Sequence, residues 1–210
     1  MLPRGPGREL AAPTSACFVT AAALIDRLHS LPADVDALVM ADYDEHGREG
    51  AREMFGIPVV DITEASAMLA LYLAPQFGVI TTLLRACSQI RDSLHTAGLL
   101  DRCAAIEAAN IPVLDLNGDL AGALEALCDA GHRALAAGAA VLALGCAGMA
   151  GLADSVQDKL AVPVIDSVTA GVALAESLIH LRLTTSKALS YAAPRHKHRA
   201  GWPLTPEELS

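Results

Sequence analysis

The stretch from Ala139 to Leu174, AAVLALGCAGMAGLADSVQDKLAVPVIDSVTAGVAL, decides the fold because it repeats the pattern of an earlier stretch of the chain. The earlier copy runs from Asp36 to Leu69, DALVMADYDEHGREGAREMFGIPVVDITEASAML, and lies 104 residues before it. Each copy contains an apolar strand, a sharp loop, a short amphipathic helix, a Pro-Val-apolar-Asp strand and a second helix. The repeat predicts two similar lobes related by a pseudo-twofold axis.

Strand and helix signals alternate along the whole chain. Strands are predicted at 37–41, 59–61, 78–82, 103–108, 140–144 and near 164–166, and helices at 19–31, 48–55, 65–73, 84–97, 120–135, 152–160 and 170–180. The strands are near-continuous apolar runs, which is typical of buried parallel strands. The predicted fold class is therefore α/β, with parallel sheets flanked by helices and an active crevice between the two lobes.

The repeat also predicts the domain organisation. The first lobe is assigned to residues 1–75 plus 169–210, which include a C-terminal extension, and the second lobe to 76–168. The second half has 69 residues before Cys146, counted from Phe77, whereas the first has only 41 before Asp42, so about 28 are lacking. They would match the strand and loop at 78–85 and most of the next strand. We expect a start site upstream of Met1 rather than a natural truncation with an open sheet edge.

The composition excludes several classes of partner. A net charge of −9 and a pI of about 5.1 provide no basic face for nucleic acid or an anionic membrane. Apolar runs are broken well short of a bilayer span, so no membrane segment is predicted. Five cysteines without a CxxC pair or a secretory signal are expected to be reduced thiols in the cytoplasm. A mean hydropathy of +0.39 predicts a homo-oligomer, because an interface would cover apolar surface.

Cys146 is the strongest candidate for a reactive side chain. In LGCAGM, residues 144–149, it follows a buried strand and precedes a helix, the place where open α/β sheets bind ligands. Backbone N–H groups and the positive helix end there favour thiolate over thiol. Gly145 and Gly148 permit a tight turn and a close approach to a ligand. The other cysteines (17, 87, 103 and 128) lie in apolar patterns and are predicted to be core residues.

Asp42, in ADYDEHG, occupies the position in the first copy that matches Cys146. It is either a catalytic group or a carboxylate that satisfies N–H groups at a helix start. Asp44 and His46 in the same loop could form a polar wall, act as an acid or do neither.

Two further pairs of polar residues end predicted strands. Thr81 and Thr82 follow the strand that opens the second half, where they would either hold a carbonyl oxygen and stabilise an enolate or cap the next helix. Asp61 and Asp166 end matched strands, and this matched placement predicts an architectural role.

Other site signatures are lacking from the sequence. It has no P-loop, no GxGxxG after a strand, no GxSxG, no HExxH and no Cys/His set with zinc spacing. His196 and His198 in the basic tail could bind a metal, although an HxH in a solvated basic tail more often has no such role. The sequence therefore implies no metal, nucleotide or flavin, and its expected partner is a small-molecule substrate.

Four motifs together resemble the hydantoin racemase branch of the aspartate/glutamate racemase superfamily. They are LGCAGM…VPVIDSVTAGVAL, GVITTLLR, DYDEHGREGARE and the late TSKALSYAAP, and the resemblance spans roughly residues 5–194. It implies a cofactor-independent enzyme with one cysteine in each lobe: one removes the α-proton and the other returns a proton to the opposite face. By resemblance, Cys146 is the second of these cysteines.

The chain departs from the family pattern at three places. The first cysteine would fall at Asp42, which we expect to serve as the other acid/base, with neighbouring Tyr43 among the substrate contacts. Amino-acid racemases of the superfamily follow each cysteine with Asn-Thr to hold a carboxylate. Here Ala147 and Gly148 follow, which favours a neutral ring such as a 5-substituted hydantoin. The Asn- and Thr-rich substrate loop at the family's amino end is missing.

Three functions remain open. The first is a racemase or epimerase in which Cys146 and Asp42 act on opposite faces of a carbon acid, with Thr81 and Thr82 at its carbonyl. The second is a single-thiol lyase resembling the arylmalonate decarboxylases, in which Cys146 alone protonates an enediolate. The third is a catalytically silent relative.

Overall fold

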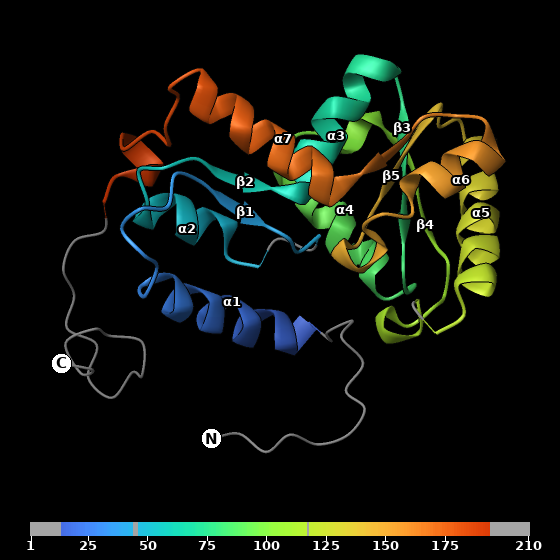
Figure 1. Ribbon diagram of the computed structural model, residues 1–210, viewed down its shortest axis with the longest axis horizontal. Coiled ribbons are helices and arrows are strands. Elements are labelled where there is room, and N and C mark those ends of the chain that lie inside the picture. The colour runs from blue at the N-terminus through green and yellow to red at the C-terminus, as the bar shows by residue number, and fades with distance from the viewer. Residues whose placement is uncertain (1–13, 44–45, 117, 194–210) are drawn as a thin grey trace.

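The computed structural model describes residues 14–43, 46–116 and 118–193, and its helices and strands alternate along the chain (Figure 1). The helices are α1 (Thr14–Leu28), α2 (Arg48–Met54), α3 (Ile62–Leu73), α4 (Ala86–Thr96), α5 (Leu120–Ala136), α6 (Ala153–Leu160) and α7 (Ser167–His180). The strands are β1 (Leu38–Met40), β2 (Val59–Asp61), β3 (Phe77–Thr81), β4 (Cys103–Ala108), β5 (Val141–Leu144) and β6 (Val164–Asp166). Every predicted strand and helix is present, and the predicted α/β class is confirmed.

All strand pairs in the described residues are parallel and form two sheets. The smaller sheet pairs β1 with β2, and the larger has the order β4-β3-β5-β6. Strands β3 and β5 in the middle of the larger sheet are fully buried, as their unbroken apolar sequences predict. In the smaller sheet β1 matches β5 and β2 matches β6, whereas β3 and β4 have no counterpart among the described residues.

Helices cover both faces of the two sheets. One core cluster joins α5 and α6 to the larger sheet, and another joins α3 and α4 to its opposite face. Helices α1 and α2 pack on one face of β1–β2, and α7 packs on the other. Helix α7 also lies along α3, so that residues 167–180 return to the smaller sheet (Figure 1). This return is what the predicted lobes require, although the lobe boundaries stay a prediction.

Two helices begin three residues earlier than the apolar pattern predicted. Helix α3 was expected from residue 65 and α7 from residue 170, but they begin at Ile62 and Ser167. The reason is capping: the Asp61 side chain accepts hydrogen bonds from the N–H groups of residues 63 and 64, and Asp166 accepts those of residues 168 and 169. The predicted architectural role of both aspartates therefore agrees with their hydrogen bonds.

The segment after α7 is tied to α2. Thr185 donates its N–H to the carbonyl of Gly56 at 2.9 Å, and its hydroxyl donates to the carbonyl of Ile57 at 2.7 Å. The Lys187 ammonium donates to three carbonyls at the end of α2, and the Tyr191 hydroxyl donates to Glu49. The described part of the C-terminal extension thus fixes α2 in place. The candidate metal ligands His196 and His198 lie outside the described residues.

Across the described ranges, no helix is both long enough and apolar enough to cross a bilayer.

Candidate active site

Cys146 lies directly beyond the carboxyl end of β5, where its backbone is extended before the short 3₁₀ turn Ala147–Met149. Two hydrogen bonds fix the preceding residue: Gly145 donates its N–H to the carbonyl of Ile80 at 2.7 Å, and its own carbonyl accepts from Thr81 Oγ1 at 3.3 Å. Cys146 is partly buried and forms no disulfide. Strand β3 and the residues at its end therefore hold the backbone just before Cys146 in position, and the expected preference for thiolate stays a prediction.

Thr81 is the last residue of β3 and Thr82 follows it, and both are almost fully buried. The Thr81 hydroxyl donates a hydrogen bond to the carbonyl of Gly145, so in this structure it supports the segment that contains Cys146. The two backbone carbonyls accept the N–H groups of Ala109 and Ile111, which attach the chain after β4. A direct role of either threonine in holding a substrate oxygen stays a prediction.

Gly148 lies close to the thiol and to a residue that the sequence did not indicate. A Cβ at Gly148 would lie 2.8 Å from Val113 Cγ1 and 3.6 Å from Cys146 Sγ. Val113 belongs to the 3₁₀ turn Val113–Asp115, which follows β4 in the chain. The absence of a side chain at Gly148 lets this turn approach Cys146. Val113 is therefore an apolar neighbour of the candidate site, and only its place after a parallel strand could have indicated it.

Asp42 follows β1 as Cys146 follows β5, and it is paired with His46. Its Oδ2 forms a hydrogen bond with Nδ1 of the imidazole, while its side chain keeps 44% of its surface exposed. His46 is buried, with 6% exposed. Within the described ranges, Asp42 Oδ1 has no hydrogen bond. One carboxylate oxygen is thus engaged by the protein.

Tyr43 connects the two candidate groups. Its ring is enclosed, with 3% exposed, and its hydroxyl lies 3.0 Å from Ser66 Oγ. A Cβ at Gly145 would lie 3.4 Å from Tyr43 Cε1, so the ring packs against the residue before Cys146. Burial raises the pKa of the Tyr43 phenol well above its usual range, so the ring is neutral at physiological pH. Tyr43 is a packing residue here, and the predicted contact with substrate stays a prediction.

A buried charge cluster supports the Asp42 loop from the side of α2. The Arg48 side chain is 1% exposed and approaches Asp61 Oδ1 at 3.8 Å and Glu64 Oε1 at 3.3 Å, and it donates to Glu49 at 2.8 Å. Burial raises the pKa of the Asp61 carboxyl to about 6, against the opposing effects of its hydrogen bonds and of Arg48. These contacts lock the start of α2, which follows His46 in the chain.

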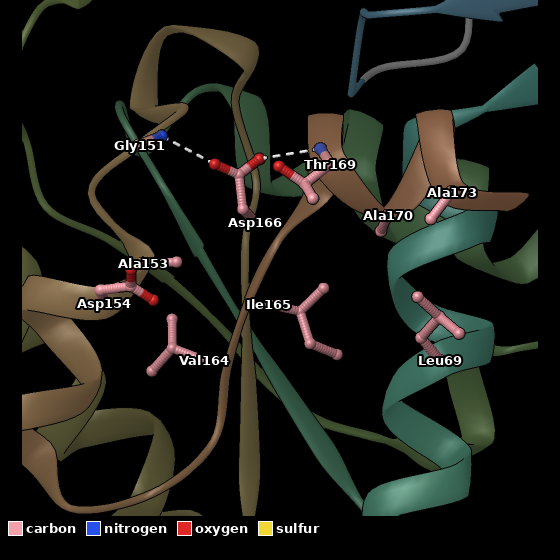
Figure 2. Close-up of a pocket in the computed structure, with 10 residues that line it drawn as sticks. All are labelled: Leu69, Gly151, Ala153, Asp154, Val164, Ile165, Asp166, Thr169, Ala170 and Ala173. Atoms are coloured by element: carbon pink, nitrogen blue, oxygen red, sulfur yellow. Dashed lines mark hydrogen bonds between the residues drawn. The ribbon is translucent and has the colours of Figure 1, made fainter.

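The matched aspartate of the second copy supports the Cys146 segment. Asp166 Oδ2 accepts the N–H of Gly151 at 2.7 Å, and its other oxygen accepts that of Thr169 at 3.1 Å (Figure 2). The same oxygen also accepts the N–H of Val168, so it caps α7. The loop that begins at Cys146 is therefore closed onto the end of β6.

An open pocket of about 430 Å³ lies beside β6, between α3, α7 and the start of α6 (Figure 2). Its lining includes Leu69, Val164, Ile165 and Asp166. The carboxylate of Asp166 is occupied by backbone N–H groups, and none of the predicted site residues lines this pocket. This pocket is therefore distinct from the predicted site at Cys146.

The described part of the chain has no cluster of three or more His, Cys, Asp or Glu side chains placed to hold a metal ion. The predicted site residues that end or follow β1, β3 and β5 supply a thiol, a carboxylate and two hydroxyls, and His46 adds an imidazole beside the carboxylate. Such a set can remove and return protons and can donate hydrogen bonds to a carbonyl oxygen.

The chain is similar to known racemases along most of its length. The model of the Asp/Glu/hydantoin racemase family matches residues 3–175. The hydantoin racemase of Pseudomonas sp. (strain NS671) is 40% identical over 168 residues, which are 80% of this chain and 68% of that protein. The hydantoin racemase of Rhizobium meliloti is 41% identical over 168 residues, covering 80% of this chain and 70% of that one.

A solved structure agrees with these sequence relatives. The crystal structure of allantoin racemase from Pseudomonas fluorescens has a TM-score of 0.88 and 43% sequence identity, and the match covers 93% of this chain and 83% of that one. The resemblance found in the four sequence motifs is therefore confirmed. The chain belongs to the Asp/Glu/hydantoin racemase family.

Proposed function

We propose that the chain is a cofactor-independent racemase or epimerase that transfers a proton at a carbon-acid centre. Its proposed substrate is a 5-substituted hydantoin or a related amino-acid derivative. The observation that carries this proposal is the contact between Tyr43 and Gly145, because it brings together the loops that bear Asp42 and Cys146. Each of these groups follows a parallel strand, at the end where α/β proteins bind ligands.

The proposed reaction uses the two groups on opposite faces of one carbon. In one direction, the Cys146 thiolate accepts the α-proton, and the electron pair of the C–H bond passes to the adjacent carbonyl as an enolate. The Asp42 carboxylic acid then donates its proton to the opposite face. In the other direction, the Asp42 carboxylate removes the proton and the Cys146 thiol returns one. Atoms and charge balance in both directions without a cofactor.

A neutral ring fits this site better than a free amino acid. Ala147 and Gly148 follow the thiol and supply backbone N–H groups without any charged side chain. The similar proteins named above act on hydantoin and on allantoin, which is itself a hydantoin with a ureido group at C5. Both comparisons support a hydantoin ring as the substrate class.

The test is hydrogen–deuterium exchange at C5 of L- and D-5-substituted hydantoins and of allantoin in deuterated water. Cys146→Ser is expected to abolish inversion. Cys103→Ser is the matched control, because Cys103 lies at the opposite, amino end of β4, where burial raises its pKa to about 11. Inversion that survives Cys146→Ser, or wild-type protein that neither exchanges nor inverts any substrate, would overturn the proposal.

A single-thiol lyase is the second candidate function. It is favoured by one specific observation, the carboxylate at position 42, because a decarboxylase that only protonates an enediolate needs no second thiol. Release of carbon dioxide from an arylmalonate, dependent on Cys146 and without inversion of hydantoins, would favour this function over the racemase.

A homo-oligomer remains a prediction. Helix α3 exposes Met68, Tyr72 and Leu73, and such apolar side chains are more typical of an interface than of a wetted surface. Light scattering combined with size-exclusion chromatography would measure the oligomeric state directly.

A further inference from the structure

The hydrogen bond between Asp42 and His46 has no counterpart in the second copy of the repeat. The position that matches His46 there, four residues after Cys146, is Ala150. The imidazole is thus present only where a carboxylate stands in place of a thiol. The two side chains differ in what they require as bases, and this difference accounts for an imidazole beside Asp42 and none beside Cys146.

A carboxylate needs orientation that a thiolate does not. The thiolate sulfur is one atom whose position is set by a single side-chain torsion. The Asp42 carboxylate has two oxygens and a second torsion that rotates broadly, and with 44% of its surface exposed it is not held by packing alone. A fixed hydrogen bond to Oδ2 removes that rotation and determines where Oδ1 lies.

The donor in this bond is assigned from its partner. When the carboxylate acts as the base it only accepts hydrogen bonds, and Nδ1 of His46 then carries the hydrogen that Oδ2 accepts. The carboxylate therefore fixes the Nδ1–H tautomer of the imidazole.

The imidazole itself is held rigidly. His46 is 6% exposed and directly precedes Gly47, which has a φ of +90° and begins α2. A Cβ at Gly47 would lie 3.7 Å from atoms of Ala21, so α1 packs against this corner. The buried Arg48 and the Lys187 contacts hold the helix that follows. The donor is therefore anchored to the fold, and only the carboxylate faces solvent.

We propose that His46 is the positioning residue for Asp42: its Nδ1–H holds Oδ2 so that Oδ1 is aimed at the α-carbon of the substrate. The inference rests on the proposed function. Asp42 Oδ1 takes the proton from carbon, the C–H electron pair remains as the enolate, and the bond from Nδ1–H to Oδ2 stays intact throughout. His46 does not touch the substrate, and the face served by Cys146 does not depend on it.

The test compares His46→Asn with His46→Gln. The Asn amide nitrogen is attached at Cγ, as Nδ1 is, so it can donate to Asp42 Oδ2. The Gln amide nitrogen lies one bond farther out, near the position of Nε2. Both variants are neutral and polar, so they form a matched pair. The measurement is deuterium entering each enantiomer with retention of configuration, which reports proton removal and return on one face at a time. Asp42→Asn and Cys146→Ser assign the faces.

Misplacement of a reacting group by about 1 Å can cost up to about 100-fold in rate. We therefore expect His46→Gln to lower exchange on the Asp42 face by about 10- to 100-fold. His46→Asn should stay within about 3-fold of wild type, and exchange on the Cys146 face should be unchanged in both. Equal loss on the two faces, or equal rates for the Asn and Gln variants, would overturn the proposal, because a merely structural role has no preferred face.

A second measurement does not depend on turnover. Nitrogen-15 NMR of the wild-type imidazole should show His46 as the Nδ1–H tautomer, and Asp42→Asn should shift its population. A predominant Nε2–H tautomer in the wild type would overturn the positioning role even if the racemase is active. Wild-type protein that exchanges no substrate while His46 is the Nδ1–H tautomer would instead count against the proposed function.

Discussion

The ring of Tyr43 packs against the backbone of Gly145, at a distance where an added Cβ would lie 3.4 Å from Cε1. These residues are about a hundred positions apart in the chain, and each directly adjoins a candidate acid/base group. The Tyr43 hydroxyl bonds to Ser66 of α3, so the contact is anchored in the core. This single contact relates the position of the carboxylate to that of the thiol.

Gly145→Ala should disturb this contact. The new Cβ would lie 2.6 Å from Val79 Cγ1 and 3.1 Å from the carbonyl oxygen of Ile80, which cannot move without bending β3. We expect a loss of about 1–3 kcal/mol in the free energy of unfolding, measured by urea denaturation, together with slower exchange on both faces. Gly56→Ala is the control because no atom lies within 4 Å of its added Cβ. Wild-type stability in Gly145→Ala would contradict the packing described.

Asp166→Ala should loosen the segment that begins at Cys146. The carboxylate accepts the N–H of Gly151 at 2.7 Å and also caps α7. Loss of the cap is expected to cost about 1–2 kcal/mol of stability, and loss of the Gly151 bond should lower the exchange rate as well. The control is Asp119→Ala, which removes the N-cap of α5. We expect it to lose stability without a change in the rate of hydrogen–deuterium exchange at the substrate carbon. If both variants retained full activity, Asp166 would have only the capping role.

The contribution of Asp61 to stability should depend on pH. Burial raises its pKa from 3.8 to about 6, so between these values the folded chain binds more protons than the unfolded chain. The free energy of unfolding contributed by Asp61 should therefore fall as the pH rises from about 4 to 6, by up to about 3 kcal/mol. Asp61→Asn keeps an oxygen for the cap and removes this titration. Urea denaturation across this range should show wild type losing stability relative to Asp61→Asn, and parallel curves would contradict the shift.

Lys187→Met should release the C-terminal segment from α2. The ammonium donates to the carbonyls of Glu53 at 2.6 Å, Arg52 at 3.1 Å and Phe55 at 3.3 Å, where a positive charge also interacts favourably with the helix end. Because the side chain is exposed, we expect a loss of about 1 kcal/mol at most, or a Tm lower by about 2–4 °C. Lys159→Met, at the exposed end of α6, is the control. An equal decrease in Tm in the two variants would show that the three hydrogen bonds of Lys187 contribute nothing to stability.

The sequence predicted the elements well because their signals are local. Each strand is a short apolar run, and each helix has its own periodic pattern, so all were found without knowledge of their partners. The largest errors lie at helix boundaries: the first helix was expected over 19–31 and spans Thr14–Leu28, and α3 and α7 begin earlier than expected. Polar Thr63 and Glu64 interrupt the apolar pattern of α3, and only the Asp61 cap shows that the helix already includes them.

The candidate site was predicted less completely. Cys146 and Asp42 could be found because the repeat places both directly after a strand, and the turn-forming glycines mark the same position. The proximity of Val113 to Gly148 and the hydrogen bond from His46 to Asp42 could not, because neither residue type in those positions has a signature of its own. Both depend on how a loop or a turn folds back on a strand end.

The sequence by itself determined the alternation of strands and helices, the internal repeat and the two matched positions that carry a thiol and a carboxylate. These follow from periodicity and from turn chemistry, which act over a few residues at a time. Only the tertiary structure decided that Tyr43 packs on Gly145, that His46 engages one oxygen of Asp42, and that residues 185–191 hold α2. The physical reason is that the contacts of Tyr43 and of residues 185–191 join segments far apart in the chain, so their geometry exists only once the strands have aligned. The bond from His46 to Asp42 is local, but it depends on how the loop after β1 folds.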